Sequence, residues 1–489
     1  MKSKGEFFIL KKVCDKILSE KLDLFIISNN SLNLIKGHPF HLSTYNWKTS
    51  KKLFKLFYYL IRNFIYLFVS IKKSYFPNKQ LKRIFTDVLI VSSLVNINDL
   101  NKKDYIFSDL ENKFKKAKIK YHKLLINHTD FSKEEIKNKL IKKKNVSILE
   151  FNYCDYKNTL LVMYNQIKYF ILFLINSMKE KDKKRKNIFF LSAIEFLNLS
   201  TKKNLNLMYN YEIFLKSLNF NKLVIPYEGY SWERLLIKCS KNKKKKLNSF
   251  GYHFSAISEF QHSIFRKIGF GYEPDNIYTT GKFSRDEFKK KINCKIKILG
   301  SNRFYPKKSI QKKRKKKIIN CLVLPEGIKS ECLKLFSFSI LAAKKFPKVR
   351  FIWRLHPSMS SDKIFPIFGY SVKKLPKNIQ LSKNSFFKDV ESADLCLYRG
   401  STSAITALQN GTMPVYLNDA STLNIDPLFK LKSWKQSINN LKDFDEIIKG
   451  GIKNIKKNTF DKKFAINFSL KYFEKLNYKI LLRDLKKNK

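Results

Sequence analysis

From Phe85 onward, short runs of apolar and β-branched residues alternate with longer stretches in which apolar residues recur at helical spacing. The short runs predict strands, and the longer stretches predict amphipathic helices. This alternation is typical of βα units that build a parallel sheet. In the first half of the chain the expected strands are Asp87–Val91, Lys123–Asn127, Val146–Glu150, Ile188–Leu191 and Lys222–Pro226, and the expected helices include Leu110–Lys118 and Asn210–Leu218.

The same alternation restarts after Cys294–Lys317, a stretch rich in lysine and turn-forming residues. We therefore expect a linker there and a second α/β lobe beyond it. The residues from Trp434 to Lys489 have helical spacing and many lysines. In the second lobe the expected strands are Ile318–Leu324, Arg350–Leu355, Ile379–Leu381, Leu395–Tyr398 and Met413–Leu417, and the expected helices are Ser330–Lys345, Phe386–Ser392 and Ser401–Asn410.

These patterns divide the 489 residues into five parts. A chain of this length exceeds what one hydrophobic core usually serves, so more than one folding unit is expected. The predicted fold class is α/β, with two Rossmann-like lobes. The five parts are a helical N-terminal extension at 1–80, a first lobe at 81–293, a basic linker at 294–317, a second lobe at 318–432 and C-terminal helices at 433–489.

Two apolar stretches, Leu53–Ile71 and Thr159–Met178, approach the length of a membrane span. Each carries a charge near its middle, Arg62 in one and Lys168 in the other, and such a charge makes spanning costly. Helices that are rich in aromatic residues and flanked by lysine also lie in the headgroup plane of membranes. Three interpretations stay open for both stretches: buried helices that pack on a sheet, interfacial helices, and membrane spans.

The formal net charge of +60 is extreme. One interpretation is an anionic partner, such as nucleic acid, phospholipid headgroups or an acidic glycan. The other is compositional, because lysine, asparagine, isoleucine and phenylalanine are all abundant while glycine and proline are scarce, as in proteins from AT-rich genomes. The lysines are spread along the chain and form no arginine-bearing patch interleaved with aromatic residues, so a specific nucleic-acid partner is not expected.

Seven cysteines lie far apart and form no CxxC pair, so neither a disulfide framework nor a zinc site is indicated. The N-terminal residues MKSKGEFFILKKVCDKIL carry charges within their apolar stretches and lack the apolar core of a signal peptide. We expect a cytoplasmic protein, peripheral at the inner face of the cytoplasmic membrane if the two apolar helices contact lipid.

The clearest candidate chemistry in the second lobe follows the expected strand Leu395–Tyr398. Arg399, Gly400, Ser401, Thr402 and Ser403 form a glycine turn and then open a helix with hydroxyl residues. Ligands of open parallel sheets bind at the carboxyl ends of strands, where the N–H groups of helix N-termini point at anions. These residues therefore predict a phosphate-binding junction, with an ordinary helix N-cap as the alternative.

Two more strand ends lie at the same predicted edge. His356-Pro357 follows a strand with Arg354 two residues before the histidine, and Glu326-Gly327 follows the first strand of the lobe. An imidazole at this edge can donate to a phosphate. We expect all five residues to face a nucleotide. The alternatives are a histidine in a plain loop and a turn built around the glycine.

In the first lobe, Glu228 and Gly229 come directly after the strand Lys222–Pro226, and Glu233 lies in the first turn of the next helix. A carboxylate at this place can take the proton of an acceptor hydroxyl as a new bond forms. Glu228 is the candidate base, and capping of the helix by Glu228 or Glu233 is the alternative. His253, in the stretch Phe250–His253, is a second catalytic candidate on the acceptor side, and a glycine turn is its alternative.

The order strand-His-Pro, strand-Gly-Ser-Thr-Ser-helix and Gly-x-x-Pro-Val at Gly411–Val415 resembles the nucleotide-binding lobe of GT-B glycosyltransferases, particularly bacterial sialyl- and polysialyltransferase-like proteins and capsule or lipopolysaccharide biosynthesis proteins. The resemblance implies an acceptor lobe at 81–293 that faces a nucleotide-sugar lobe at 318–432 across a cleft. It also implies that the His-Pro and Ser-Thr motifs hold the nucleotide and phosphate of a CMP-sugar. Glu228 matches the acidic base of these families, although Tyr227 stands where a second acid is common.

Two features common in related sugar transferases are missing. Thr406 occupies the neighbourhood of the glutamate that holds the ribose in many UDP-sugar enzymes, and no DxD motif ends a strand. Asp443-Phe444-Asp445 begins a C-terminal helix, where acids cap the helix dipole. The expected donor is therefore CMP-linked, with no metal and no cofactor, since the nucleotide-sugar is a co-substrate.

The expected function is transfer of a sugar from this donor to a bacterial surface glycan or a lipid-linked acceptor. The same two motifs also resemble glycerophosphotransferases of teichoic acid synthesis, so a CDP-glycerol-type phosphotransferase is an alternative. A non-catalytic basic protein that binds a membrane or nucleic acid is the alternative from another class.

Overall fold

The computed structural model describes eight residues between 54 and 69 and most of 84–487. The gaps within the second range are 98–99, 101, 130, 132, 140–144, 153, 244–245, 260–262, 267–270, 305–317, 357–358, 360, 369–374, 420–423 and 451–458. The predicted extension at 1–80 and the lysine-rich run at 307–317 therefore lie almost entirely outside the described residues.

The first lobe is built on a seven-stranded parallel sheet in the order β4-β3-β2-β6-β7-β8-β9. Four of its five predicted strands are confirmed, and β7, β8 and β9 were not predicted. A short pair, β1 (Ile84–Phe85) with β5 (Leu218–Asn219), lies beside the sheet. The strands are β2 (Val88–Leu94), β3 (Tyr121–Asn127), β4 (Val146–Glu150), β6 (Lys222–Pro226), β7 (Asn248–His253), β8 (Asn276–Thr279) and β9 (Lys295–Ile298).

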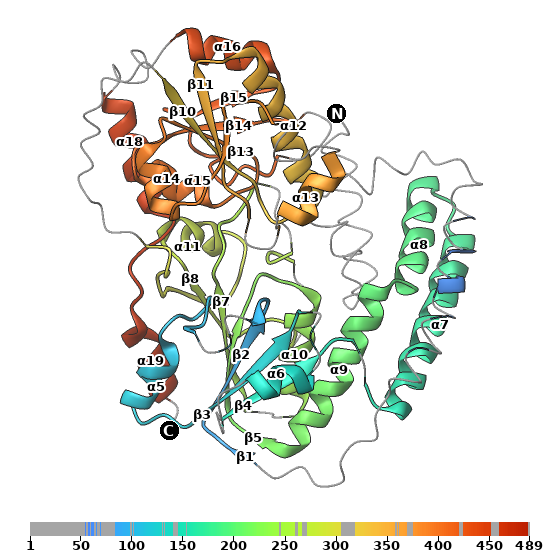
Figure 1. Cartoon of the computed structure of the whole chain (residues 1–489). Coiled ribbons are helices and arrows are strands. Elements are labelled where there is room, and N and C mark those ends of the chain that lie inside the picture. The colour runs from blue at the N-terminus through green and yellow to red at the C-terminus, as the bar shows by residue number, and fades with distance from the viewer. Residues whose placement is uncertain are drawn as a thin grey trace.

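The helices of this lobe cover both faces of the sheet, and two of them stand apart from it (Figure 1). They are α5 (Leu110–Lys116), α6 (Lys133–Lys139), α7 (Tyr156–Lys179), α8 (Lys183–Phe196), α9 (Leu199–Ser217), α10 (Ser231–Lys243) and α11 (Lys282–Lys289).

The predicted strand Ile188–Leu191 is wrong, because these residues belong to α8. A short apolar run is compatible with a strand or with a buried helix face, and here the flanking residues decide. Asp182 caps the helix by accepting a hydrogen bond from the backbone N–H of Arg185. Phe189 then packs near Phe173 of α7 with ring centroids 6.2 Å apart, so the apolar run is the helix-facing side of a hairpin.

The predicted linker begins too early. Strand β9 occupies residues 295–298 and pairs in parallel with β8, so the first sheet extends into the stretch that we assigned to the linker. The backbone of Ser301 then forms an isolated bridge with Lys475 of the C-terminal segment. Strand β9 was missed because lysines occupy alternate positions of it, and the sequence pattern there is typical of a basic loop.

The second lobe contains a six-stranded parallel sheet in the order β12-β11-β10-β13-β14-β15. All five predicted strands and all three predicted helices of this lobe are present, with ends shifted by two residues or fewer. The strands are β10 (Ile319–Leu324), β11 (Val349–Trp353), β12 (Ile379–Leu381), β13 (Leu395–Tyr398), β14 (Met413–Leu417) and β15 (Gln436–Ile438), and the helices are α12 (Lys329–Lys345), α13 (Ser361–Phe368), α14 (Phe386–Ser392) and α15 (Ser403–Gln409).

The α/β architecture of two Rossmann-like lobes is confirmed (Figure 1). In each sheet the first long strand lies in the interior, and the chain builds outward from it first on one side and then on the other. The strand β2 lies between β3 and β6, and β10 lies between β11 and β13. Such reversals of strand order are the places where ligands of open α/β sheets bind.

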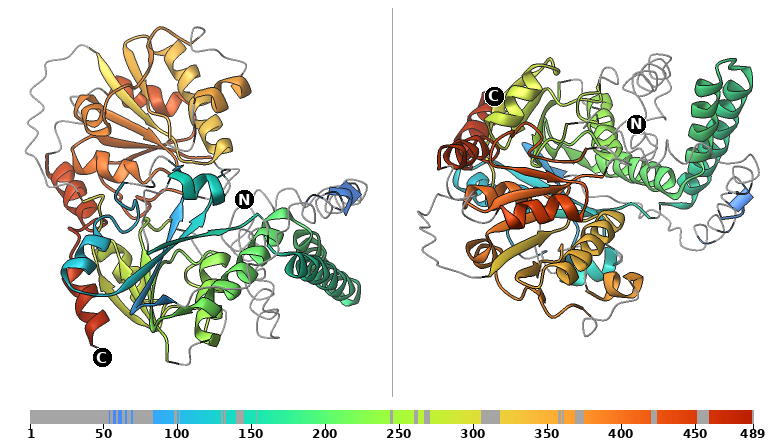
Figure 2. Two further views of the ribbon diagram at one scale, coloured as in Figure 1. Left: turned by 60° about the horizontal axis from the view of Figure 1, so that its bottom comes forward. Right: turned by 90° about the horizontal axis from the view of Figure 1, so that it is seen from above.

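The C-terminal segment adds α16 (Leu441–Lys449), α18 (Thr459–Leu470) and α19 (Tyr478–Lys486). It also supplies β15 to the second sheet, so the prediction that this segment is entirely helical is wrong in that detail. The chain then returns to the first lobe, as the red ribbon shows in Figures 1 and 2. Tyr478 donates its hydroxyl to the carbonyl of Phe107, and Tyr278 donates to Asp484 at 2.5 Å.

Asp443 accepts a hydrogen bond from the backbone N–H of Asn439 at 2.7 Å, and Phe444 is buried. The N-cap of α16 is Asn440, and Asp443 lies in the first turn, where the sequence predicted that an acid complements the helix dipole.

The returning segment generates a prediction about Gly300, whose φ is +88° and whose Cα faces the backbone of Lys475. A Cβ at this position would lie 2.5 Å from the carbonyl carbon of Lys475. We expect Gly300→Ala to lower the free energy of unfolding by roughly 2–4 kcal/mol, measured by urea denaturation.

Gly271 is the matched control, because its φ is +92° and an added Cβ would meet only the flexible side chain of Lys238 at 3.2 Å. Gly271→Ala should cost only about 1 kcal/mol, the penalty of a left-handed backbone. Equal losses for the two variants would contradict the packing of the C-terminal segment described above.

Candidate functional site

The carboxyl ends of the two sheets face each other. Arg303, which follows β9, donates from Nη1 to the Oγ1 atom of Thr402, which follows β13, at 2.8 Å. Asn424, which follows β14, donates to a carboxylate oxygen of Glu259, beyond the end of β7, at 3.0 Å. Both contacts join residues that come after strand ends, so the strand-end motifs of the two lobes meet at a common edge.

Glu228 lies on a tight loop between β6 and α10. Gly229 has a φ of +80°, and a Cβ there would overlap the backbone of Ser263, so glycine permits the close approach of two loops. Glu233 accepts hydrogen bonds from the backbone N–H groups of Glu228 at 2.8 Å and Tyr230 at 2.9 Å. Glu233 thus does the capping that was the alternative role for Glu228.

The side chain of Glu228 points to the end of β7 instead. Its Oε1 atom accepts a hydrogen bond from the backbone N–H of Ser255 at 3.0 Å, and the residue is 7% exposed. Arg234 is fully buried and donates hydrogen bonds to the backbone carbonyls of Ser263 and Arg266. It thereby stabilises the loop that packs against Gly229. The carboxylate of Glu228 is therefore held at the edge of the first sheet. Glu233 stabilises the loop that carries Glu228, and Arg234 connects the beginning of α10 to the loop around Ser263.

His253 lies behind Glu228 and is 0% exposed. Its ring packs edge-on against Phe288, with centroids 4.8 Å apart. Burial lowers the pKa of the imidazole, and the nearby carboxylate of Glu228 opposes that shift. The prediction of His253 as a catalytic residue near the acceptor needs correction, because a ring with no accessible surface cannot touch a ligand. Its Nε2 atom lies 3.5 Å from the hydroxyl of Ser255, the residue whose backbone N–H donates to Glu228.

Arg303 is the residue that connects the two lobes electrostatically. It interacts with Glu228 of the first lobe and with His356 of the second, besides its hydrogen bond to Thr402. Its side chain is exposed, yet the protein around it lowers the pKa of the guanidinium by desolvation. Desolvation, reinforced by the charge of Arg303, also lowers the pKa of His356. A cation, a carboxylate, an imidazole and a hydroxyl therefore converge at this edge.

Glu326 and Gly400 bring the ends of β10 and β13 together. A Cβ at Gly400 would overlap the carboxylate of Glu326, so the carboxylate lies directly against the glycine backbone. Within the described part of the chain, the Oε1 atom of Glu326 is buried and has no hydrogen-bond partner. Burial raises the pKa of this carboxyl to about 7, with the charge of Glu331 adding to the shift and Arg399 opposing it.

Two arginines that we expected at the nucleotide are engaged elsewhere. Arg399 is 2% exposed, donates from Nε to Glu331, and donates from Nη1 to the carbonyl of Leu417. Arg354 donates from Nη1 to Asp389 at 2.9 Å and is held beside α14. Buried carboxylates need such partners, so both guanidinium groups stabilise the lobe, and the side chain of Arg354 stays 31% exposed. Contact of either arginine with a phosphate stays a prediction.

Three other predicted residues adjoin Thr402 or Glu326 in the sequence. Ser401 is buried, Ser403 is the first residue of α15, and Gly327 follows Glu326 before α12 begins. Pro357 lies outside the described residues. Glu326, Gly400 and Thr402 are thus brought together on the second lobe, and Arg303 ties them to Glu228.

A cavity of about 560 Å³ opens at the carboxyl edge of the first sheet. Its walls combine aromatic rings with amide side chains from the ends of β2, β3, β4, β6 and β7 and from α9. The lining residues include Tyr105, Asn127, His128, Phe151, Asn152, Lys203, Asn204, Tyr230, Trp232 and Phe254. The charged residues Lys203 and Glu233 also line the cavity. Aromatic faces and hydrogen-bonding groups together suit a ligand that has both apolar faces and hydroxyl groups.

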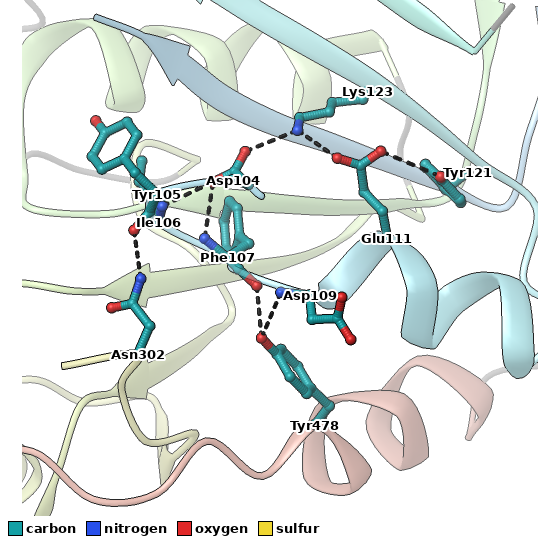
Figure 3. Close-up of polar contacts among 10 residues, drawn as sticks. All are labelled: Asp104, Tyr105, Ile106, Phe107, Asp109, Glu111, Tyr121, Lys123, Asn302 and Tyr478. Atoms are coloured by element: carbon teal, nitrogen blue, oxygen red, sulfur yellow. Dashed lines mark hydrogen bonds and ion pairs between the residues drawn. The ribbon is translucent and has the colours of Figure 1, made fainter. Parts of the chain in front are cut away.

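Tyr105 reaches this cavity from a loop that a buried ion-pair network holds in place (Figure 3). Asp104 accepts hydrogen bonds from the backbone N–H groups of Ile106 and Phe107, while Lys123 bridges Asp104 and Glu111. The carbonyl of Tyr105 accepts from Asn302 at 2.8 Å. Asn302 directly precedes Arg303, so the segment that follows β9 contacts both the loop of Tyr105 at the cavity and Thr402 of the second lobe.

Sequence reasoning missed His128, Trp232 and Arg303. His128 directly follows β3, so the strand-end criterion that selected His356 would have found it. Its ring lies 4.7 Å from Phe151 and 5.7 Å from Trp232. The side chain is exposed at the cavity, yet desolvation by the surrounding protein, reinforced by the charge of Lys203, lowers the pKa of the imidazole to about 4. Arg303 carried no such signal, since it is one of many basic residues in a stretch interpreted as a linker.

Glu326 generates a prediction about stability. Its pKa is 4.5 in an unperturbed carboxyl and about 7 in the folded chain, so between these values the folded state binds more protons than the unfolded state. Stability should therefore fall as the pH rises from 4.5 to above 7. The neutral variant Glu326→Gln should escape this loss and be more stable than the parent at pH 8 by up to about 3 kcal/mol, with little difference at pH 4.

Chemical denaturation of the two proteins across this pH range measures the difference. A difference in unfolding free energy that stays constant with pH would contradict a titrating, buried Glu326.

No family model and no curated protein matches the sequence. Solved structures with similar folds include the glycosyltransferase of kitacinnamycin, at 9% identity over 82% of this chain and 99% of that chain, with a TM-score of 0.46. MurG of Acinetobacter baumannii is similar over 82% and 99% of the two chains, at 8% identity and a TM-score of 0.46. The UDP-GlcNAc 2-epimerase of Neisseria meningitidis, solved with UDP-GlcNAc, is 13% identical over 82% and 100%, with a TM-score of 0.45. Identities this low say nothing about the ligand of this chain.

Proposed function

We propose that this chain is a glycosyltransferase of GT-B-like architecture that moves a sugar from a nucleotide donor to a glycan or lipid-linked acceptor. The observation that carries the proposal is the contact between Arg303 and Thr402 at 2.8 Å, which joins a cation of the first lobe to the glycine-hydroxyl turn of the second. Arg303 also interacts electrostatically with Glu228, which supports a base and a phosphate site at one edge. Inverting transfer needs both a base and an anion site.

The donor nucleotide would occupy the second-lobe side of this edge. Arg303 and the hydroxyl of Thr402 can donate to phosphate oxygens, and His356 offers a third donor beside them. Glu326, with a pKa of about 7, is protonated in a large fraction of molecules at neutral pH and can then donate a hydrogen bond itself. These four side chains form the proposed nucleotide site.

The chemical step follows from this arrangement. The acceptor hydroxyl attacks the anomeric carbon of the donor sugar and loses its proton to Glu228. A new carbon–oxygen bond forms while the bond from that carbon to the phosphate oxygen breaks, and its electron pair leaves with the nucleotide phosphate. Arg303 stabilises the charge that develops on that phosphate. His253 is buried and lies 3.5 Å from the hydroxyl of Ser255, so it acts as a positioning residue for the carboxylate through Ser255.

The acceptor would enter the cavity of the first lobe. Tyr105, Tyr230 and Trp232 provide faces on which sugar rings stack, and Asn127 and Asn152 provide hydrogen bonds to hydroxyl groups. A CMP-linked donor and metal-independent transfer remain part of the proposal. Thr406 stands where many UDP-sugar enzymes have a ribose-binding carboxylate, which supports a CMP-linked donor. Arg303 can stabilise the phosphate in place of a metal ion, which supports metal-independent transfer.

Nucleotide binding tests the first step. Titration calorimetry of the full chain with CMP and UDP should show binding of CMP, the tighter of the two. Arg303→Gln removes the charge that faces the phosphate and should weaken CMP binding by roughly tenfold or more. Binding of neither nucleotide, or an unchanged affinity in the variant, would contradict the donor site.

Glu228→Gln tests the base. The amide oxygen of glutamine can still accept from Ser255, so the loop should persist, whereas proton transfer should fail. We expect transfer from a CMP-sugar to fall by about 10²–10⁴-fold, with CMP affinity retained, measured by mass spectrometry of the product. Glu259→Gln, a carboxylate at the same edge that bonds Asn424, is the matched control and should keep its transfer rate. Transfer that survives in Glu228→Gln would refute the assignment, and a product mass increased by glycerol phosphate would identify a phosphotransferase.

A further inference from the structure

The hairpin of α7 and α8 projects from one side of the first lobe in all the views of Figures 1 and 2. One face of α7 packs on α8 and α9, where Val162 and Phe173 are fully buried. Phe173 stacks on Phe196 with ring centroids 5.1 Å apart, and Gln166 donates to the carbonyl of Phe196. This face accounts for the hairpin's internal stability, and within the described part of the chain the other face of α7 is largely exposed.

The other face carries a line of apolar side chains, which we name the α7 stripe. Its members are spaced three or four residues apart, so they form one continuous row along the helix. The members, each between 42% and 71% exposed, are Leu160, Tyr164, Ile167, Ile171, Ile175 and Met178. Exposed apolar rows of this length are rare on soluble proteins and indicate a contact surface.

A second set of exposed apolar residues lies next to the stripe. The described residues between 54 and 69 are helical, and they lie beside α7 in Figures 1 and 2, where they are drawn in blue. Five of them, Phe54, Tyr58, Ile61, Ile65 and Val69, are spaced three or four residues apart. The exposed members are Phe54, Phe57, Tyr58, Leu60, Ile61, Ile65 and Val69, between 37% and 74% exposed.

The charges around the stripe are mostly positive. Residues 156–196 contain eight basic and three acidic residues, and one of the acids, Glu195, is buried. Lys168 lies within the exposed face, with its ammonium 5.8 Å from the ring of Tyr164, where a long side chain can extend its charge past the apolar row. The exposed basic residues are Lys157, Lys168, Lys179, Lys181, Arg185 and Lys186.

We propose that the α7 stripe and the exposed residues between 54 and 69 lie in the headgroup layer of an anionic phospholipid membrane. Apolar side chains enter the acyl boundary, and the surrounding lysines pair with lipid phosphates. The basic surround selects a lipid surface over a second copy of this chain, since two equally positive hairpins repel each other.

The hairpin lies on the membrane and does not span it. Among the described residues α7 is the one helix long and apolar enough to cross a bilayer, and 22% of its most apolar stretch is buried. A spanning α7 would carry α8 into the lipid together with its run of basic residues from 183 to 186, at a cost of several kcal/mol. An interfacial position leaves α8 and α9 on the aqueous side.

The contact has a consequence for the cavity. Helix α9 continues directly from α8, and Ser200, Lys203 and Asn204 near its beginning line the cavity. A membrane held by the hairpin therefore lies on the same side of the first lobe as the helix that forms one cavity wall. This lipid contact does not depend on the proposed transfer reaction.

Sedimentation of the full chain with vesicles tests the proposal. The protein should pellet with vesicles that contain phosphatidylglycerol, pellet much less with phosphatidylcholine alone, and be released by added salt. The double variant Ile167→Ser with Ile171→Ser should bind the anionic vesicles at least about tenfold more weakly. Both positions are exposed, at 42% and 47%, so the fold should persist, as far-UV circular dichroism and the thermal midpoint would verify.

Leu341→Ser is the matched control, because Leu341 is 53% exposed on α12 of the second lobe and away from the stripe. It should bind the anionic vesicles like the parent protein. The proposal is overturned if the parent pellets with neither vesicle, or if the double variant binds as well as the parent. Vesicle binding that is unaffected in a double variant that has lost self-association would instead assign the stripe to a second copy.

Discussion

The constraint on which the site depends is that two parallel sheets present their carboxyl ends to each other. In a parallel sheet every loop that follows a strand emerges at the same edge, so side chains far apart in sequence are collected there. The hydrogen bond from Arg303 to Thr402 and the one from Asn424 to Glu259 join two such edges. The return of the C-terminal segment to the first lobe, through Tyr478 and Asp484, holds the second lobe in this orientation.

In the first lobe, neighbouring residues after β6 have different roles: some stabilise the loop, and one offers its side chain for chemistry. Glu233 caps the backbone, Arg234 ties two loops together, and Gly229 lets these loops approach. Because Glu233 does the capping, the carboxylate of Glu228 instead accepts a hydrogen bond from Ser255, just beyond the end of β7. The buried network of Lys123 and Asp104 stabilises the loop that carries Tyr105 to the cavity.

Most strands followed from the sequence because buried strands of parallel sheets are short apolar runs between turn residues. The strand predicted at Ile188–Leu191 failed because an apolar run of four residues also fits a helix face. Strand β9 was hidden by its lysines. The strand ends also located Glu228, Glu326, Gly400 and Thr402, since position after a strand is visible in the sequence.

The sequence could not predict which side chains contact each other across long separations in the chain. Arg399 and Glu331 are 68 residues apart, and Arg354 and Asp389 are 35 apart, so nothing local indicates that each arginine neutralises a buried carboxylate. The same holds for Arg303 and Thr402, which are 99 residues apart and come from different lobes. His253 looked accessible because it ends a strand, although the packing of Phe288 closes over it.

The central claim is that a nucleotide phosphate binds between Arg303 and Thr402, opposite Glu228. A crystal structure of the full chain with CMP tests this claim most directly. The account predicts density for the phosphate within hydrogen-bond distance of the Arg303 guanidinium and the Thr402 hydroxyl, with the cavity of the first lobe left open for an acceptor. CMP bound inside that cavity, or bound nowhere at concentrations that saturate CMP-binding enzymes, would contradict it.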